Sequence, residues 1–157
     1  MHNLTDMKKL LILLVITCSA TSYTLAQKIS YDEALAKEVG ADDYGMRKYV
    51  IAFLYRGDKV DQYSEQERSD IQAGHMANIN RLAGEGEMVM AGPFFGNEEL
   101  RGLFFFAVES LEEAQKLTES DPAIKAGILK MDLKEWYGSA ALMLMSDMHT
   151  KVAKVEI

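Results

Sequence analysis

The chain has 157 residues, of which 48% are hydrophobic and 26% are charged, and its formal net charge is −7. This length suffices for one domain with a sizeable core, whereas the negative charge argues against a nucleic-acid-binding protein, because such proteins present basic surfaces. The one cysteine is Cys18, which excludes a disulfide framework, a cysteine nucleophile and a zinc–cysteine cluster in the rest of the chain.

Residues 1–26 have the three parts of a secretory signal: two lysines, an apolar run over 10–16, and small residues up to Ala26. The apolar run is shorter than the roughly 20 residues that cross a bilayer. We therefore expect cleavage near Ala26, a periplasmic or secreted protein, and no stable membrane insertion afterwards. Two less favoured alternatives stay open: lipid attachment at Cys18 and, weaker still, a buried N-terminal helix.

The next segment, 27–47, is predicted to be an N-terminal leader with a short helix over 33–39 that ends at Gly40. Residues 48–55 are rich in β-branched and aromatic side chains. Such a composition is typical of a strand, so the folded domain is expected to begin here.

Ser64 and Glu67 have the spacing of a capping box, which predicts that the first long helix runs over 65–83. The later elements follow from their residue patterns: a strand over 87–92, a strand over 100–109, a helix over 110–120 and a strand over 128–138. The order β-α-β-β-α-β predicts an α+β protein with the ferredoxin-like sandwich fold. In this fold both helices cover one face of an antiparallel sheet.

The other face of the predicted sheet is also apolar. Hydrophobic side chains point to both sides of the first strand, and 103–108 shows the same two-sided pattern. An apolar sheet face without helices is typical of an interface. We therefore expect a homodimer that closes through the sheets.

A C-terminal tail is expected over 142–157, after a domain that covers 48–141. Apolar and polar residues alternate at its end, over 151–157, which predicts an additional edge strand. The methionines of the tail are expected to be packing residues rather than metal ligands, because Met commonly fills gaps in apolar cores.

One ionisable residue falls on the apolar side of the first long helix. At about 100° per residue, His75 lies within the apolar stripe, whereas the polar residues Asn78, Asn80 and Arg81 are assigned to the solvent side. The chain has no HxH or HExxH spacing, so we expect no metal. His75 is then either a core residue whose ring is satisfied by hydrogen bonds or a residue that moves protons.

Both prolines of the chain mark backbone turns. Gly92 and Pro93 end the second strand, where a proline removes a ladder donor. Asp121 before Pro122 fits a helix N-cap followed by a proline at the first helical position. The helical wheel also turns Asp121 toward the first helix, where its carboxylate could reach His75.

Over about residues 48–141 the chain resembles the YCII-related (YciI-like) family. The segments that carry the resemblance are "AFLYRG", "HMANINRLAGEGEMVMAGPF", "LRGLFFFAVESLEEAQKL", "DPAIKAGI" and "EWYG". The resemblance implies a dimeric α/β barrel with the ferredoxin-like fold, and an active-site pair at His75 and Asp121. Most members have no assigned reaction, and one branch removes chloride from a chlorinated hydroxyquinol. The export signal, the leader and the longer tail depart from the usual compact member.

With this resemblance, His75 and Asp121 are interpreted as a general acid–base pair for a lyase- or isomerase-like proton transfer, which needs no cofactor. The ligand is expected to be a small molecule, and aromatic compounds are among the candidates. The candidate ligand-contacting residues are Arg81, Gly92, Pro93, Phe94, Trp136 and Tyr137. Catalysis itself stays open against two alternatives: a non-catalytic binding protein with the same cleft, and a structural protein in which the pair only satisfies a buried histidine.

Overall fold

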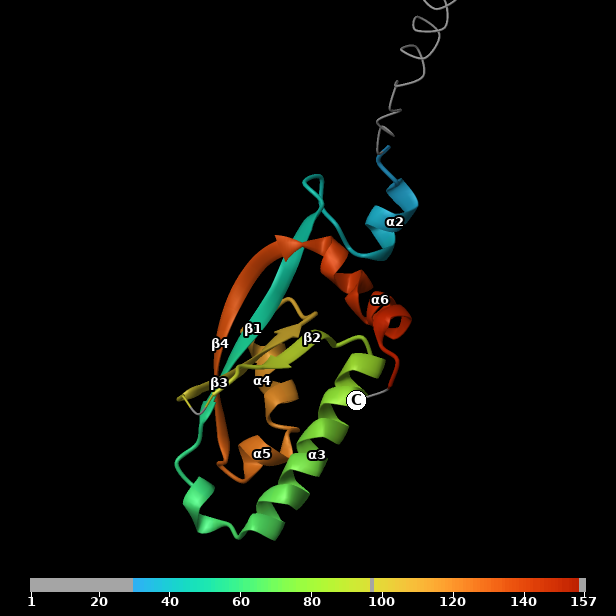
Figure 1. Ribbon diagram of the computed structural model, residues 1–157. Coiled ribbons are helices and arrows are strands. Elements are labelled where there is room, and N and C mark those ends of the chain that lie inside the picture. The colour runs from blue at the N-terminus through green and yellow to red at the C-terminus, as the bar shows by residue number, and fades with distance from the viewer. Residues whose placement is uncertain (1–29, 97, 156–157) are drawn as a thin grey trace, which may run out of the picture. The chain divides into compact units, whose positions relative to one another are not determined.

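The computed structural model describes residues 30–96 and 98–155. The predicted signal, with Cys18, lies outside these residues. Glu33–Ile157 form one compact unit, built around a four-stranded sheet (Figure 1).

The elements follow the predicted order. They are α2 (Glu33–Glu38), β1 (Met46–Arg56), η1 (Val60–Gln62), α3 (Glu65–Gly84), β2 (Met88–Pro93), β3 (Leu100–Phe106), α4 (Leu111–Thr118), α5 (Pro122–Lys125), β4 (Leu129–Ser139), η2 (Ala140–Leu144) and α6 (Met145–Val152). The ferredoxin-like β-α-β-β-α-β arrangement is confirmed, with α5 as an additional short helix before the last strand. The capping box of Ser64 and Glu67 begins α3, as predicted.

The sheet has the strand order β2-β3-β1-β4, and all neighbouring strands are antiparallel. Alternate residues of β1 point into the main core, which also receives side chains from β2, β3 and β4. From the helices, Leu82 of α3 and Ala114 of α4 are buried in the same cluster. Both long helices therefore cover one face of the sheet, as the sequence predicted.

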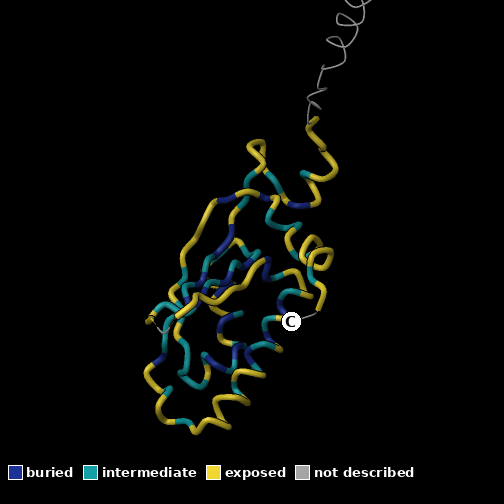
Figure 2. Tube along the Cα trace, in the orientation of Figure 1, coloured by how far each residue is buried: buried dark blue, intermediate teal, exposed yellow. Residues whose placement is uncertain are grey.

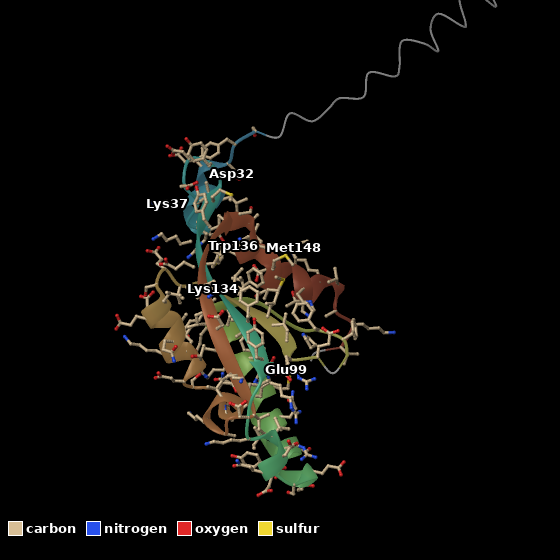
Figure 3. All side chains as sticks on the ribbon, turned by 90° about the vertical axis from the view of Figure 1, so that its left-hand side faces the viewer. Asp32, Lys37, Glu99, Lys134, Trp136 and Met148 are labelled. Atoms are coloured by element: carbon tan, nitrogen blue, oxygen red, sulfur yellow. The ribbon has the colours of Figure 1, made fainter. Side chains whose placement is uncertain are left out.

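The prediction of an edge strand in the tail is wrong. Ser139 instead caps η2, accepting a hydrogen bond from Ala141 N, and α6 continues the chain and packs against β2 (Figure 1). Lys151 and Val152, where the alternating pattern begins, belong to α6. In Figure 3, α6 and α4 lie on opposite sides of the strands. The second face of the sheet is thus partly covered by the chain's own C-terminal segment.

Tyr49, on this second face, is fully buried. Its ring lies 5.9 Å from that of Trp136, and its hydroxyl donates to the Ser139 carbonyl at 2.9 Å. Burial raises the pKa of the Tyr49 hydroxyl above its ordinary value, against the opposing effect of the Arg47 charge. Further along the strand, Ile51 and Phe53 are only half-buried, and the homodimer stays a prediction.

Two glycines let the end of β1 approach the segment before β4. The Gly57 amide donates to the Ile128 carbonyl at 2.7 Å, and a Cβ on Gly57 would lie 2.1 Å from the Gly127 oxygen. Gly127 itself has a φ of 71°, in the left-handed region that favours glycine. This close approach fixes the position of α5, which begins after Asp121 and ends two residues before Gly127.

Replacing Gly57 by alanine tests this contact. Because the new methyl group would collide with backbone, we expect Gly57→Ala to lower the free energy of unfolding by about 1–3 kcal/mol, the usual cost of overpacking. Urea denaturation measures it. Gly84→Ala is the matched control: a Cβ there meets nothing within 4 Å, and alanine is favoured in helices. Equal stability of both variants and wild type would contradict the prediction.

Candidate active site

His75 lies on α3 with its ring turned toward the sheet. Only 6% of the residue is exposed. The ring stacks on Phe104 of β3, with 5.8 Å between centroids and an interplanar angle of 25°. His75, Asn78 and Leu82 are the buried residues of α3 and lie on the same side of the helix.

Asp121, 1% exposed, uses its two carboxylate oxygens for two partners. Oδ1 accepts from the amide of Ala123 at 2.8 Å, which caps α5. Oδ2 lies 2.7 Å from Nδ1 of His75. Of the two roles that the sequence left open for Asp121, capping and contact with His75, the structure therefore shows both.

Close packing of α3 on α5 makes this contact possible. A Cβ on Gly74 would meet Cγ of Pro122 at 3.1 Å, so the glycine before His75 allows the two helices to approach. Pro122 begins α5 at the position where a missing amide proton costs nothing.

The hydrogen bond sets the state of the imidazole. An ionised carboxylate only accepts hydrogen bonds, so Nδ1 of His75 carries the proton that lies between the two groups. In the neutral ring, Nε2 then keeps a lone pair. Within residues 30–96 and 98–155, no hydrogen-bond partner of Nε2 is found. The carboxylate of Asp121 therefore fixes the tautomer of the His75 ring.

Asn78 lies one helical turn after His75 and is 8% exposed, so its assignment to the solvent side was wrong. Its Oδ1 accepts from Arg81 at 3.0 Å and from the Ser120 hydroxyl at 3.0 Å. Since a guanidinium only donates, Arg81 fixes the orientation of the amide. Nδ2 is therefore turned away from these partners, and within the described part of the chain it is buried without a hydrogen bond.

The other predicted ligand-contacting residues do not form one group with His75. Arg81 is linked to the pair through Ser120, the neighbour of Asp121, to which it donates a hydrogen bond. Pro93 pairs with Gly102, two residues from Phe104. The positions of the rest are as follows: Gly92 pairs with Leu103, Phe94 is exposed beyond β2, Trp136 contacts Phe105, and Tyr137 contacts Asp42.

Trp136 lies on the opposite face of the sheet from His75. It packs on Tyr49 and Phe105, whereas the neighbouring Phe104 carries the His75 ring. Successive residues of a strand point to opposite faces, so Phe104 and Phe105 of β3 place His75 and Trp136 on opposite sides of the sheet. The sequence analysis assigned Trp136 to the predicted ligand site, but the face of the sheet on which Trp136 lies depends on the strand register.

Tyr137 anchors the leader to the sheet. Its hydroxyl donates to the carboxylate of Asp42. This hydrogen bond lowers the pKa of Asp42 and raises the pKa of Tyr137. The contact gives Tyr137 a structural role at the end of β4.

An open cavity of about 450 Å³ lies elsewhere, with Arg47, Glu87, Glu113 and Lys116 among its lining residues, and none of the predicted site residues lines it.

Over the described ranges, no three His, Cys, Asp or Glu side chains are grouped to hold a metal ion. In the same residues, no helix is both long and apolar enough to cross a membrane.

Comparison with known proteins gives three findings. The family model described as "YCII-related domain" matches residues 48–137. The uncharacterized protein YjpA of Bacillus subtilis (strain 168) is 34% identical over 64 residues, which are 41% of this chain and 73% of YjpA. The 5-chloro-2-hydroxyhydroquinone dehydrochlorinase TftG of Burkholderia phenoliruptrix AC1100, solved with 2,5-dihydroxybenzoquinone, has 22% identity and a TM-score of 0.43, over 57% of this chain and 93% of TftG.

Asp121→Asn separates the two functions of the carboxylate. Asparagine caps helices about as well as aspartate, so its oxygen keeps the Ala123 bond and its NH₂ faces Nδ1 of His75. Nδ1 must then accept, and the imidazole proton moves to Nε2. We expect ¹⁵N NMR of the His75 ring to show this tautomer change, at a cost of about 1–3 kcal/mol in stability.

The control is Asp132→Asn, since Asp132 is exposed on β4. This variant should leave the His75 tautomer unchanged. A well-folded Asp121→Asn protein whose proton stays on Nδ1 would show that the carboxylate does not set the state of the ring.

Proposed function

Because this chain belongs to the YCII-related domain family, we propose that it is a cofactor-independent enzyme that moves a proton on a small organic molecule. The observation that carries the proposal is the buried hydrogen bond of 2.7 Å between His75 and Asp121. It leaves Nε2 of the imidazole as the atom that exchanges a proton with the substrate.

The proposed step begins when Nε2 of His75 takes a proton from a carbon or oxygen atom of the substrate. Asp121 stabilises the imidazolium that forms, through the hydrogen bond at Nδ1. The imidazolium then returns the proton. Return to a different atom of the substrate is an isomerisation, whereas transfer to a departing group completes an elimination. General acid–base catalysis of this kind contributes about 10²–10⁴ in rate.

Asn78 is the proposed donor to the substrate. Removing a proton leaves negative charge, which in a carbonyl or phenolic compound collects on oxygen. Nδ2 of Asn78 is buried and unpaired within the described residues, and side chains three apart on a helix are neighbours. An amide donor beside the base stabilises such an oxygen. A small molecule with a carbonyl or phenolic oxygen is therefore the proposed substrate class.

Two further proposals concern the setting of the site. Export follows from the features of residues 1–26, and a homodimer follows from the half-buried apolar side chains on the second sheet face. N-terminal sequencing of the mature protein tests the first, because a chain that still begins at Met1 would contradict it. Sedimentation tests the second, because a monomer at micromolar concentration would contradict it.

A screen of the mature protein distinguishes an enzyme from a binding protein. Phenolic, lactone and haloaromatic compounds are tested by thermal shift and by product formation. We expect turnover in wild type and a loss of about 10² or more in rate for His75→Gln. Gln72→Ala, exposed on the same helix, should keep the wild-type rate. Thermal shift without product would indicate the non-catalytic binding protein, and equal rates in both variants would exclude His75 as the base.

Asn78→Leu should change activity and stability differently. The substitution removes a buried unpaired donor, which relieves about 1–3 kcal/mol, and loses two hydrogen bonds worth about 0.5–1.5 kcal/mol each. These effects roughly cancel, so urea denaturation should show stability close to wild type. Loss of an oxyanion donor costs about 10²–10³ in rate. Wild-type turnover in this variant would show that Nδ2 does not contact the substrate.

A further inference from the structure

The C-terminal segment gathers methionines that the main core does not use. Three of the ten methionines of the chain fall at 143, 145 and 148, and His149 follows directly. Packing was the expected role. In the structure, however, Met145 is 43% exposed and Met148 is 51% exposed, and α6 has no buried residue (Figure 2). Core packing therefore does not account for these two side chains.

Helix geometry brings three potential ligands together. On α6, Met148 lies three residues after Met145, and His149 lies four residues after Met145. Each of these two spacings makes a residue the neighbour of Met145 on the helix surface, with about 5–6 Å between the Cβ atoms. Met148 and His149 flank Met145 on its two sides, about 100° from each other around the helix. The His149 side chain is exposed as well, and in the described part of the chain no hydrogen bond to its ring is found. Two thioether sulfurs and one imidazole nitrogen are thus available on the same surface.

We propose that Met145, Met148 and His149 bind one soft monovalent metal ion, Cu(I) or Ag(I), on the exposed face of α6. Thioethers are soft, neutral donors that select Cu(I) over ions preferring oxygen ligands. Zinc sites in proteins use Cys, His and carboxylates instead. The proposed site is separate from His75, because α6 lies on the side of the strands opposite to α4 (Figure 3).

Binding at this site involves no electron transfer, since the ion enters as Cu(I) or Ag(I) and all three ligands are neutral. The imidazole must be unprotonated to bind, so protons compete with the metal and the affinity should fall in acid. Apart from His149, the titratable groups of α6 are Asp147 and Lys151, and the two elements packed against α6, β2 and η2, contain no titratable side chain. None of these groups supplies a donor in the proposed site.

Titration of the full mature chain with silver nitrate in chloride-free buffer tests the proposal. We expect one Ag(I) per chain, with shifts of the ε-methyl signals of Met145 and Met148 and of the His149 ring in NMR spectra. The signals of Met88 and His75 should stay in place. Met148→Leu and His149→Gln should each weaken the affinity at least about tenfold, since even the residues that only orient metal ligands cost 10–100-fold when mutated.

Met131→Leu is the matched control, because it exchanges a methionine of similar size at a half-buried position of β4 and leaves α6 unchanged. It should bind Ag(I) as wild type does. The proposal is overturned by no saturable binding, by equal affinity in Met148→Leu and wild type, or by shifts at Met88 or His75 in place of α6. Equal binding of Zn²⁺ would also overturn it, because a site of two thioethers and one imidazole should discriminate against zinc.

Discussion

One buried carboxylate holds the local fold and the candidate site together. Asp121 satisfies one oxygen with the Ala123 amide and the other with His75. A carboxylate buried to this degree requires such partners, so the cap of α5 and the orientation of the imidazole depend on each other. Gly74 is what permits the approach of the two helices. A site of this kind is built by backbone packing as much as by its polar groups.

The sequence predicted the fold well because its signals were local. A capping box, strands rich in β-branched and aromatic residues, and glycine-terminated helices each specify structure within a few residues, and together they predicted the β-α-β-β-α-β order of a ferredoxin-like fold. His75 and Asp121 could also be identified as candidate site residues, since the helical periodicity placed His75 on the apolar side of its helix and turned Asp121 toward that helix. Their contact joins residues 46 positions apart, and only the assembled fold shows it.

Other features required tertiary information. Asn78 was missed although a signal existed: at 100° per residue it lies only about 60° from His75 on the helical wheel, and its polarity alone suggested the solvent side. Trp136 was placed beside the pair because strand periodicity does not reveal which face meets which helix. The tail was misread because an alternating pattern of seven residues does not distinguish a strand from the end of an exposed helix.

The path of the last residues bears on the order in which the molecule folds. β1 is central in the sheet, yet its neighbour β4 begins only at Leu129, and the carbonyl that receives the Tyr49 hydroxyl belongs to Ser139. β1 is therefore synthesised early, but its second neighbour and the partner of the Tyr49 hydroxyl become available only when the C-terminal part of the chain has been made. Such long sequence separations slow folding and leave apolar strands open to misassociation in the meantime.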